Sequence, residues 1–265
     1  MARLRALSAI LLIVWLILPL IPLAIWSFAG AWRYPYLLPQ DWSLGPWSFA
    51  LSDQAGVLSS LALTAGIALS VTAICTVIGV PAGRALGLYR FRGKAMVELM
   101  ILAPIIVPGI AVALGLQTVF IGLGLNNTVT GVVLVHLIPT LPYMVLVMAS
   151  VFAAYDPLAE DQARSLGASP AQVFRHITLP TILPGVVVGA MFTFLVSWGQ
   201  YILTLTIGGG RVQTLPLIMF QFVASGRNDI TGAIAMIYIL PGVLIVALTA
   251  RSLTGRSAAM TGLSR

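Results

Sequence analysis

The chain of 265 residues is too apolar for a soluble globular domain, because hydrophobic residues make up 59% of it and charged residues only 8%, with a mean hydropathy of +1.03. These values predict an all-α polytopic membrane protein with a single membrane domain covering residues 1–265. The formal charge of +7 could indicate a nucleic-acid partner. This interpretation fails if membrane topology accounts for the positions of the basic residues. The single cysteine, Cys75, lies in an apolar run and provides neither a disulfide framework nor a metal-ligand pattern.

The first expected span covers residues 7–28 and follows two arginines. Its uncharged run is longer than the roughly 7–15 apolar residues of a secretory signal peptide, so we expect it to be retained as a transmembrane helix. The loop that follows, residues 30–56, is rich in tryptophan, tyrosine and proline. These residues favour the membrane–water interface, and we expect the loop to lie outside the cytoplasm.

Five more uncharged intervals are long enough to cross a membrane, and they cover residues 57–81, 99–121, 132–152, 182–207 and 230–250. A turn rich in glycine and asparagine separates the second of these intervals from the third. Residues 89–94, with the sequence YRFRGK, form the densest basic segment. This segment is not a P-loop, because Gly87 and Gly93 are separated by five residues and Ala95 stands where a hydroxyl would hold Mg²⁺.

Six spans place both termini on the same side of the membrane. Eleven of the fourteen Lys and Arg residues fall on that side, and only Arg33, Arg211 and Arg227 fall on the other. The positive-inside rule therefore predicts that the termini, the basic segment 89–94 and the polar segment 156–180 are cytoplasmic. Membrane topology accounts for the positive charge, and we expect no nucleic-acid partner.

Residues 156–180, called here the coupling segment, are predicted to form two short helices. The first begins after Asp156, which is a favourable N-cap residue, and ends at Gly167, which can adopt the left-handed conformation. Ser169 and Gln172 have the spacing of a capping box that opens the second helix. The first helix is two-sided, with Leu158, Ala159, Ala163 and Leu166 on its apolar side and Glu160, Asp161, Arg164 and Ser165 on its polar side.

The coupling segment resembles the EAA loop of permease subunits of binding-protein-dependent ABC importers. The resemblance rests on the spacing Asp161-Gln162-Ala163, three residues, Gly167, nine residues, Ile177-x-Leu179-Pro180. Asp161 and Gln162 depart from the Glu-Ala with which the family pattern begins. Residues 89–94, and His136 followed by Leu141-Pro142, are similar to polyamine-type (spermidine/putrescine-like) permeases, and the similarity extends from about residue 57 to residue 251.

The resemblance implies a type I ABC importer-like fold in the bacterial cytoplasmic (inner) membrane. It implies that a coupling helix sits in a groove of a separate ATP-hydrolysing subunit, so that this chain is not itself an enzyme and needs no cofactor. The residues expected at that contact are Glu160, Asp161, Ala163, Arg164, Gly167, Ala168 and Ser169. The expected partners are a dimer of ATP-binding subunits, a second permease chain, a periplasmic or lipid-anchored binding protein, a small solute and membrane lipid.

Polar residues inside the spans are candidates for the translocation pathway, and they are Gln117, His136, Ser197, Gln200, Tyr201 and Thr204. The last four recur at helical spacing, so they predict a polar, cavity-lining face on the fifth span. Hydrogen bonding between helices is the alternative for all six, and it is the favoured role for His136 and Gln117. Polyamine permeases tend to carry acidic residues where this chain has Gly199 and Gln200, which argues against a cationic polyamine as the solute.

A secondary transporter or channel that is not coupled to ATP is the main alternative function. Ion-coupled carriers usually place ionisable groups at the membrane midplane, whereas no Asp, Glu, Lys or Arg lies within the expected spans. A membrane enzyme is excluded because the two histidines fall on opposite sides of the predicted topology, without a cysteine or carboxylate cluster to complete a site. The sequence does not identify the solute.

Overall fold

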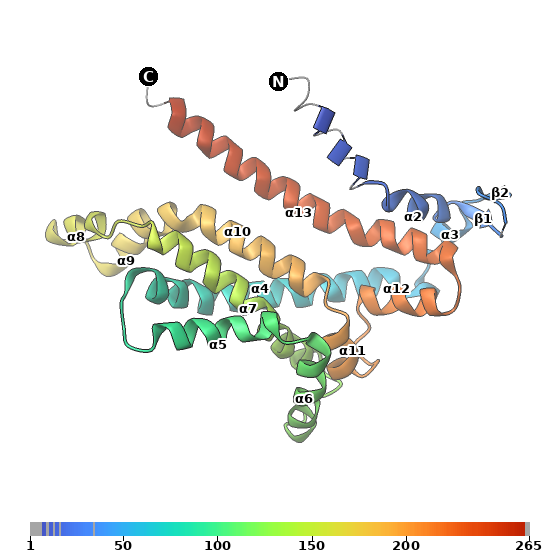
Figure 1. The fold of residues 1–265 in the computed structure, drawn as a ribbon, viewed down its shortest axis with the longest axis horizontal. Helices are drawn as coiled ribbons and strands as arrows, with labels where there is room; N and C mark the ends of the chain where they lie inside the picture. Colours follow the sequence, from blue (N-terminus) through green and yellow to red (C-terminus); the bar gives the residue numbers. More distant parts are fainter. Residues whose placement is uncertain (1–6, 9–10, 13, 16, 34, 263–265) are drawn as a thin grey trace. The chain divides into compact units, whose positions relative to one another are not determined.

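Helices make up most of the computed structural model, which describes residues 7–8, 11–12, 14–15, 17–33 and 35–262 (Figure 1). This architecture confirms the predicted all-α class. The chain divides into two compact units, residues 1–63 with 213–242 and residues 64–212 with 243–265. The boundaries between the units fall near the starts of helices α4 (Val57–Leu88) and α12 (Leu215–Ala224) and within helix α13 (Asn228–Gly262).

Four helical segments among the described residues are long and apolar enough to cross a membrane. They are α4, α7 (Val129–Ala153), the run Pro170–Trp198, and the part Asn228–Ala250 of α13. A fifth candidate is the bent pair formed by α5 (Lys94–Ile106) and α6 (Gly109–Gly122). The first expected span, 7–28, falls partly on residues outside the described part of the chain, and helix α2 (Leu20–Trp26) lies within it.

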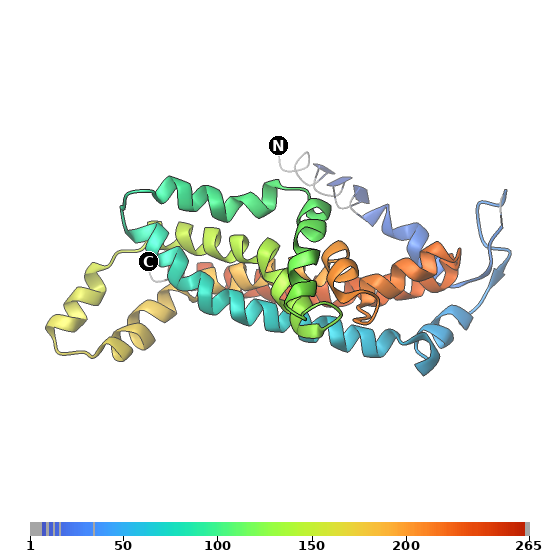
Figure 2. The same ribbon diagram turned by 90° about the horizontal axis from the view of Figure 1, so that it is seen from below.

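The expected third span, residues 99–121, is not one straight helix. The structure bends this region by 101° between α5 and α6, and Figure 2 shows α6 turning away from α5. Pro108 occupies the break, and Val107 before it is extended, with φ −75° and ψ 132°. A proline ring clashes with a helical conformation at the preceding residue, so the bend follows from the Val-Pro step.

The first unit combines α2, strands β1 (Ala29–Ala31) and β2 (Asp41–Trp42), α3 (Gly45–Ala50), η1 (Asp53–Ala55), α12 and the starts of α4 and α13. The two strands pair antiparallel. A core of buried side chains, including Val57, Leu215, Ile230 and Ile234, holds α4, α12 and α13 together. Helix α12 was not expected, because its residues lie between the expected spans 182–207 and 230–250; proline in its first turn was the available signal.

The second unit packs around α7, which contacts α4, α5, α10 (Leu179–Trp198) and α11 (Ile202–Gly208). Three glycines of α4 face α7 at successive helical turns, namely Gly79, Gly83 and Gly87. A Cβ atom at these positions would overlap Met144, Met148 and Phe152 of α7, respectively. Small residues allow transmembrane helix backbones to approach closely, so the glycines set the distance between α4 and α7.

Replacing Gly83 with alanine should lower the thermal stability of the protein. The new Cβ would overlap Met148 and lie 2.9 Å from the backbone nitrogen of Ala149, and overpacking of this kind costs about 1–3 kcal/mol. Gly66→Ala in the same helix is the control, because a Cβ there meets nothing within 4 Å. Thermal unfolding of the purified protein measures both variants, and an unchanged melting temperature for Gly83→Ala would contradict the close contact.

Candidate functional site

The coupling segment forms the two short helices that its sequence predicts. Helix α8 covers Leu158–Ser165 with Pro157, one residue later than expected, at its N-cap, and the Asp156 carboxylate accepts a hydrogen bond from the Leu158 N–H at 3.0 Å. Gly167 adopts the left-handed conformation with φ +88°. The structure confirms the capping box of Ser169 and Gln172. It opens helix α9 (Pro170–Val173), which continues through the π-helical turn η2 (Phe174–Thr178) into α10.

The carboxylate of Glu160 is the centre of a buried polar cluster, although Glu160 belongs to the short polar helix α8. Arg84, near the end of α4, binds both carboxylate oxygens, with Nη1–Oε1 at 2.9 Å and Nη2–Oε2 at 2.7 Å. The hydroxyls of Tyr155 and Thr178 each donate to Oε1 at 2.8 Å. Arg164 donates to Oε2 at 2.9 Å. One side chain thus joins α8 to the ends of α4 and α7 and to η2.

Hydrogen bonding from Arg84 lowers the pKa of Glu160 from its ordinary 4.5 to about 2, against the opposing effect of burial. The hydroxyls of Thr178 and Tyr155 lower this pKa further. A carboxylate with a lowered pKa stabilises the folded state above its unfolded value and loses this contribution as the pH falls through the folded value. The cluster is therefore fully effective above about pH 4.5 and is lost toward pH 2.

The structure corrects the predicted role of Glu160. It was expected at the contact with the ATP-hydrolysing subunit, but it is only 1% exposed. Leu158 and Leu166, on the apolar side of the predicted helix, are 61% and 89% exposed. Glu160 faces inward because its ionic and hydrogen-bonding partners surround it. The other six expected contact residues, Asp161, Ala163, Arg164, Gly167, Ala168 and Ser169, are exposed or partly exposed.

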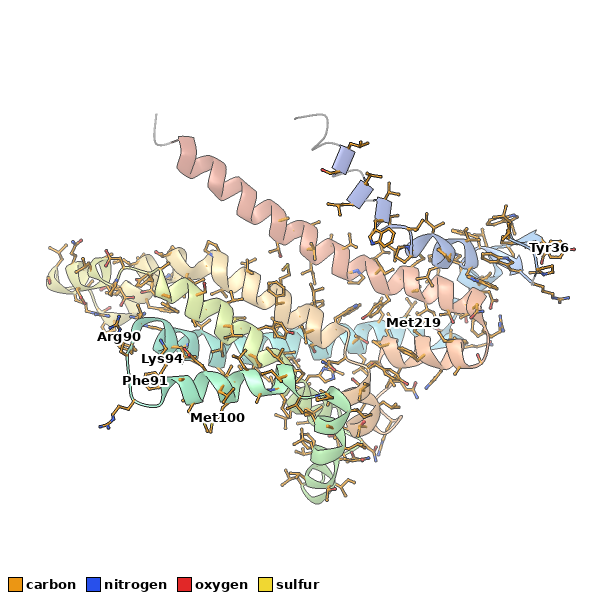
Figure 3. The ribbon with its side chains drawn as sticks, in the orientation of Figure 1. Tyr36, Arg90, Phe91, Lys94, Met100 and Met219 are labelled. Carbon is orange, nitrogen blue, oxygen red and sulfur yellow. The ribbon has the colours of Figure 1, made fainter. Side chains whose placement is uncertain are left out.

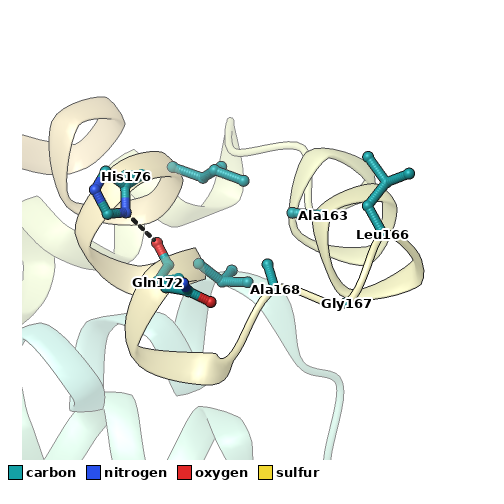
Figure 4. A pocket seen from close by; sticks show the side chains of 8 residues that line it. Ala163, Leu166, Gly167, Ala168, Gln172 and His176 are labelled. Carbon is teal, nitrogen blue, oxygen red and sulfur yellow. Dashed lines mark hydrogen bonds between the residues drawn. The ribbon is translucent and has the colours of Figure 1, made fainter.

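A pocket of about 390 Å³ opens between α8 and the α9–η2 helix (Figure 4). Small residues line its α8 side, including Ala163, Gly167 and Ala168. His176 lies on the opposite wall, and its Nδ1 donates to the carbonyl oxygen of Gln172 at 3.0 Å. The coupling segment therefore combines an exposed apolar tip with a hollow beside it.

His136 lies at the centre of a second buried polar cluster, within the spans. Its Nδ1 is 3.0 Å from the Ser197 hydroxyl of α10, and its Nε2 is 2.9 Å from the Thr204 hydroxyl of α11. Thr204 donates its proton to the carbonyl oxygen of Gln200, so it accepts from Nε2–H. In a neutral imidazole that carries this proton, Nδ1 accepts from the Ser197 hydroxyl. His136, Ser197 and Thr204 are all buried, and this geometry is that of a helix-to-helix connection.

The predicted continuous polar face of the fifth span is wrong. Helix α10 ends at Trp198 and α11 begins at Ile202, so the four polar residues at helical spacing do not share one helix. Gly199 lies at the break. Beyond it, the Thr204 hydroxyl donates to the carbonyl oxygen of Gln200. Gln200 and Tyr201 at the break, and Gln117 in α6, are partly exposed.

Comparison with known proteins identifies the family of this chain. Residues 79–256 match the model of the binding-protein-dependent transport system inner membrane component. The chain belongs to this family. It is a permease subunit of an ABC importer and a multi-pass protein of the inner membrane, and this membership decides against the secondary transporter or channel considered from the sequence.

The permease is 31% identical to the spermidine/putrescine transport system permease protein PotC of Haemophilus influenzae, over 69% of this chain and 71% of that protein. It is 32% identical to the molybdenum transport system permease protein ModB of Mycobacterium bovis, over 78% and 82% of the two chains. Its fold resembles a chain in the crystal structure of a bacterial ABC transporter that imports alginate, with a TM-score of 0.72, 17% identity and coverage of 94% and 95%.

Arg84, Tyr155 and Thr178 complete the Glu160 cluster, and sequence reasoning missed all three. Arg84 is 76 residues from Glu160 and was counted only among the basic residues that indicate sidedness. Thr178 lies between Ile177 and Leu179 of the family pattern, at a position that the pattern leaves variable. No local signal marked Glu160 as buried, so its need for basic and hydroxyl partners became evident only in the structure.

Replacing Glu160 with alanine should destabilise the permease by about 2 kcal/mol. Breaking a fully buried ion pair costs about 3–5 kcal/mol, and the partial exposure of Arg84 reduces the loss. Asp161→Ala is the matched control, since its ion pair with Arg164 is exposed and contributes little. Thermal unfolding measures the difference, and equal effects of the two changes would contradict the central role of Glu160.

Replacing His136 with alanine should also lower the melting temperature, by an amount equivalent to about 1–3 kcal/mol, because Ser197 would lose a buried hydrogen-bond partner and Thr204 a donor. Gln117→Ala, at a partly exposed position in α6, should change stability little. Solute uptake by the two variants separates the roles. A normal melting temperature with lost uptake for His136→Ala would indicate a pathway residue instead of a connection between helices.

Proposed function

We propose that the outer surface of the coupling segment is the contact through which a separate ATP-hydrolysing subunit drives this permease. The observation that carries the proposal is the exposure of Leu166, which at 89% is the most exposed large apolar side chain of the coupling segment. An exposed apolar residue beside a pocket is typical of a protein-binding surface. Asp161 and Arg164 contribute charges at the rim of this surface, and Gly167 holds the corner that presents Leu166.

Glu160 acts on this contact indirectly, as a positioning residue. Its bonds to Arg84, Tyr155 and Thr178 attach α8 to α4, to the end of α7 and to η2. A displacement of α8 by the ATPase dimer would therefore be passed to several spans at once. This arrangement supports coupling in which ATP hydrolysis takes place on the partner and the permease contributes only the moving pathway.

The coupling segment and both termini lie on the cytoplasmic side in this proposal. The bond between Arg84 and Glu160 supports it, because it brings the coupling segment to the end of α4 that precedes the basic segment 89–94. The two segments that the positive-inside rule assigns to the cytoplasm are thus at the same end of the second unit. The same assignment places the loop between β1 and β2 on the periplasmic side, where a binding protein would deliver the solute.

The pathway of this chain is proposed to handle a small solute through neutral hydrogen-bonding groups, with a second permease chain completing it. The remaining candidates are Gln200 and Tyr201 at the break between α10 and α11 and Gln117 in α6, which are all partly exposed. Helices α6, α7, α10 and α11 contain no carboxylate. The names of PotC and ModB refer to different solutes, and the absence of acids disfavours a polyamine held by charge.

Replacing Leu166 with aspartate should abolish co-purification of the ATPase with the permease, because a charge would face the partner in place of the apolar tip. Leu37→Asp is the matched control. Leu37 is 91% exposed, comparable with 89% for Leu166, but it lies in the loop between β1 and β2. The control variant should retain both insertion and the ATPase.

Uptake and ATP hydrolysis by membranes containing each variant provide the second measurement. The Leu166→Asp permease should insert normally and show no ATP-dependent uptake. Normal co-purification and normal uptake in this variant would refute the proposed contact.

A further inference from the structure

The loop between α4 and α5 presents two guanidinium groups that have no acidic partner. Arg90 and Arg92 are exposed and form none of the ion pairs found in the described part of the permease. Lys94, in contrast, donates to the carbonyl oxygen of Leu86 at 2.6 Å and lies 3.8 Å from Glu98. Exposed Tyr89 and Phe91 alternate with the two arginines, so the loop combines positive charge with aromatic rings.

An apolar groove begins next to this loop. It lies between α5 and α7, has a volume of about 350 Å³, and is lined by residues such as Val97, Pro104, Leu137 and Leu141. Val97 follows Lys94 by three residues, which corresponds to about 4.5 Å along a helix axis. Figure 3 shows Arg90, Phe91 and Lys94 at the start of α5, with Met100, another lining residue, farther along the same helix.

Prolines explain why α5 and α7 leave this space. Pro104 of α5 and Pro142 of α7 both line the groove, and a proline inside a helix removes a backbone hydrogen bond and kinks the helix. The contact between α4 and α7 is the opposite case, because glycines there bring the two backbones together. We therefore attribute the groove to the prolines of both helices.

We infer that the loop and the groove form one binding site for an anionic glycerophospholipid of the inner leaflet. Arg90 and Arg92 bind the phosphate, because guanidinium groups form charge-assisted, bidentate hydrogen bonds with phosphate oxygens. An acyl chain occupies the groove, whose apolar lining begins at Val97, three residues after Lys94. Tyr89 and Phe91 lie at the level of the lipid headgroups, where aromatic rings are favoured. The inference rests on the cytoplasmic placement of the loop that is proposed above.

The test uses the purified full-length permease in lipid nanodiscs of phosphatidylcholine with or without phosphatidylglycerol. Phosphatidylglycerol should raise the melting temperature of the wild-type protein and remain bound after delipidation. The double variant R90Q/R92Q should lose both effects, and high salt should weaken the headgroup interaction. R211Q is the control, since Arg211 is also exposed but lies outside the loop, and it should retain both effects.

The groove is tested with Met100→Trp, which adds bulk to its lining, against Met96→Trp on the same helix. Met100 and Met96 are 61% and 55% exposed, and only Met100 lines the groove. Met100→Trp should lose the retained phosphatidylglycerol, whereas Met96→Trp should keep it. Inorganic phosphate alone should not raise the melting temperature.

Three results would overturn the inference. They are a full phosphatidylglycerol effect in R90Q/R92Q, reproduction of the effect by inorganic phosphate, and loss of a second permease chain in Met100→Trp with unchanged lipid retention. The last result would assign the groove to a protein partner. Co-purification of the ATPase tests the coupling contact separately, so the two proposals can fail independently.

Discussion

The bidentate ion pair between Arg84 and Glu160 joins the polar coupling segment to the membrane-spanning part of the second unit. Helix α8 turns little apolar surface inward, because Leu158 and the following Leu166 are exposed. Its attachment therefore depends on a carboxylate that is removed from water and satisfied by five hydrogen bonds. A carboxylate is costly to bury unless every partner is in place. The cluster therefore favours a single position of α8 against α4 and η2.

Close packing of α4 against α7 connects this ion pair to the rest of the second unit. Arg84 lies between Gly83 and Gly87 on the face of α4 that meets α7, and its guanidinium is 5.5 Å from the ring centre of Phe152. Phe152 belongs to α7, whose backbone the glycines of α4 approach closely. His136, farther along α7, binds both α10 and α11. Helix α7 thus carries contacts from the coupling segment to the interrupted fifth span.

Local signals in the sequence predicted local structure correctly. Asp156, Gly167 and the Ser169–Gln172 capping box each act within a few residues, so their chemistry is readable without the fold. The orientation of α8 was not readable, since amphipathic periodicity assumes that the apolar side faces inward, and Glu160 finds its partner 76 residues away. The break after Trp198 gave little warning, because a single glycine is tolerated inside many helices.

The π-helical turn at Phe174–Thr178 sets the angular relation between the coupling segment and α10. A π turn contains one residue more than an α-helical turn, and one residue corresponds to about 100° of rotation about an α-helix axis. The π turn lies immediately before α10 and includes Thr178, whose hydroxyl donates to Glu160. Shortening this turn by one residue would swing the hydroxyl away from the carboxylate while leaving both flanking helices intact. The widened turn therefore fixes the rotation of the coupling segment relative to membrane helix α10.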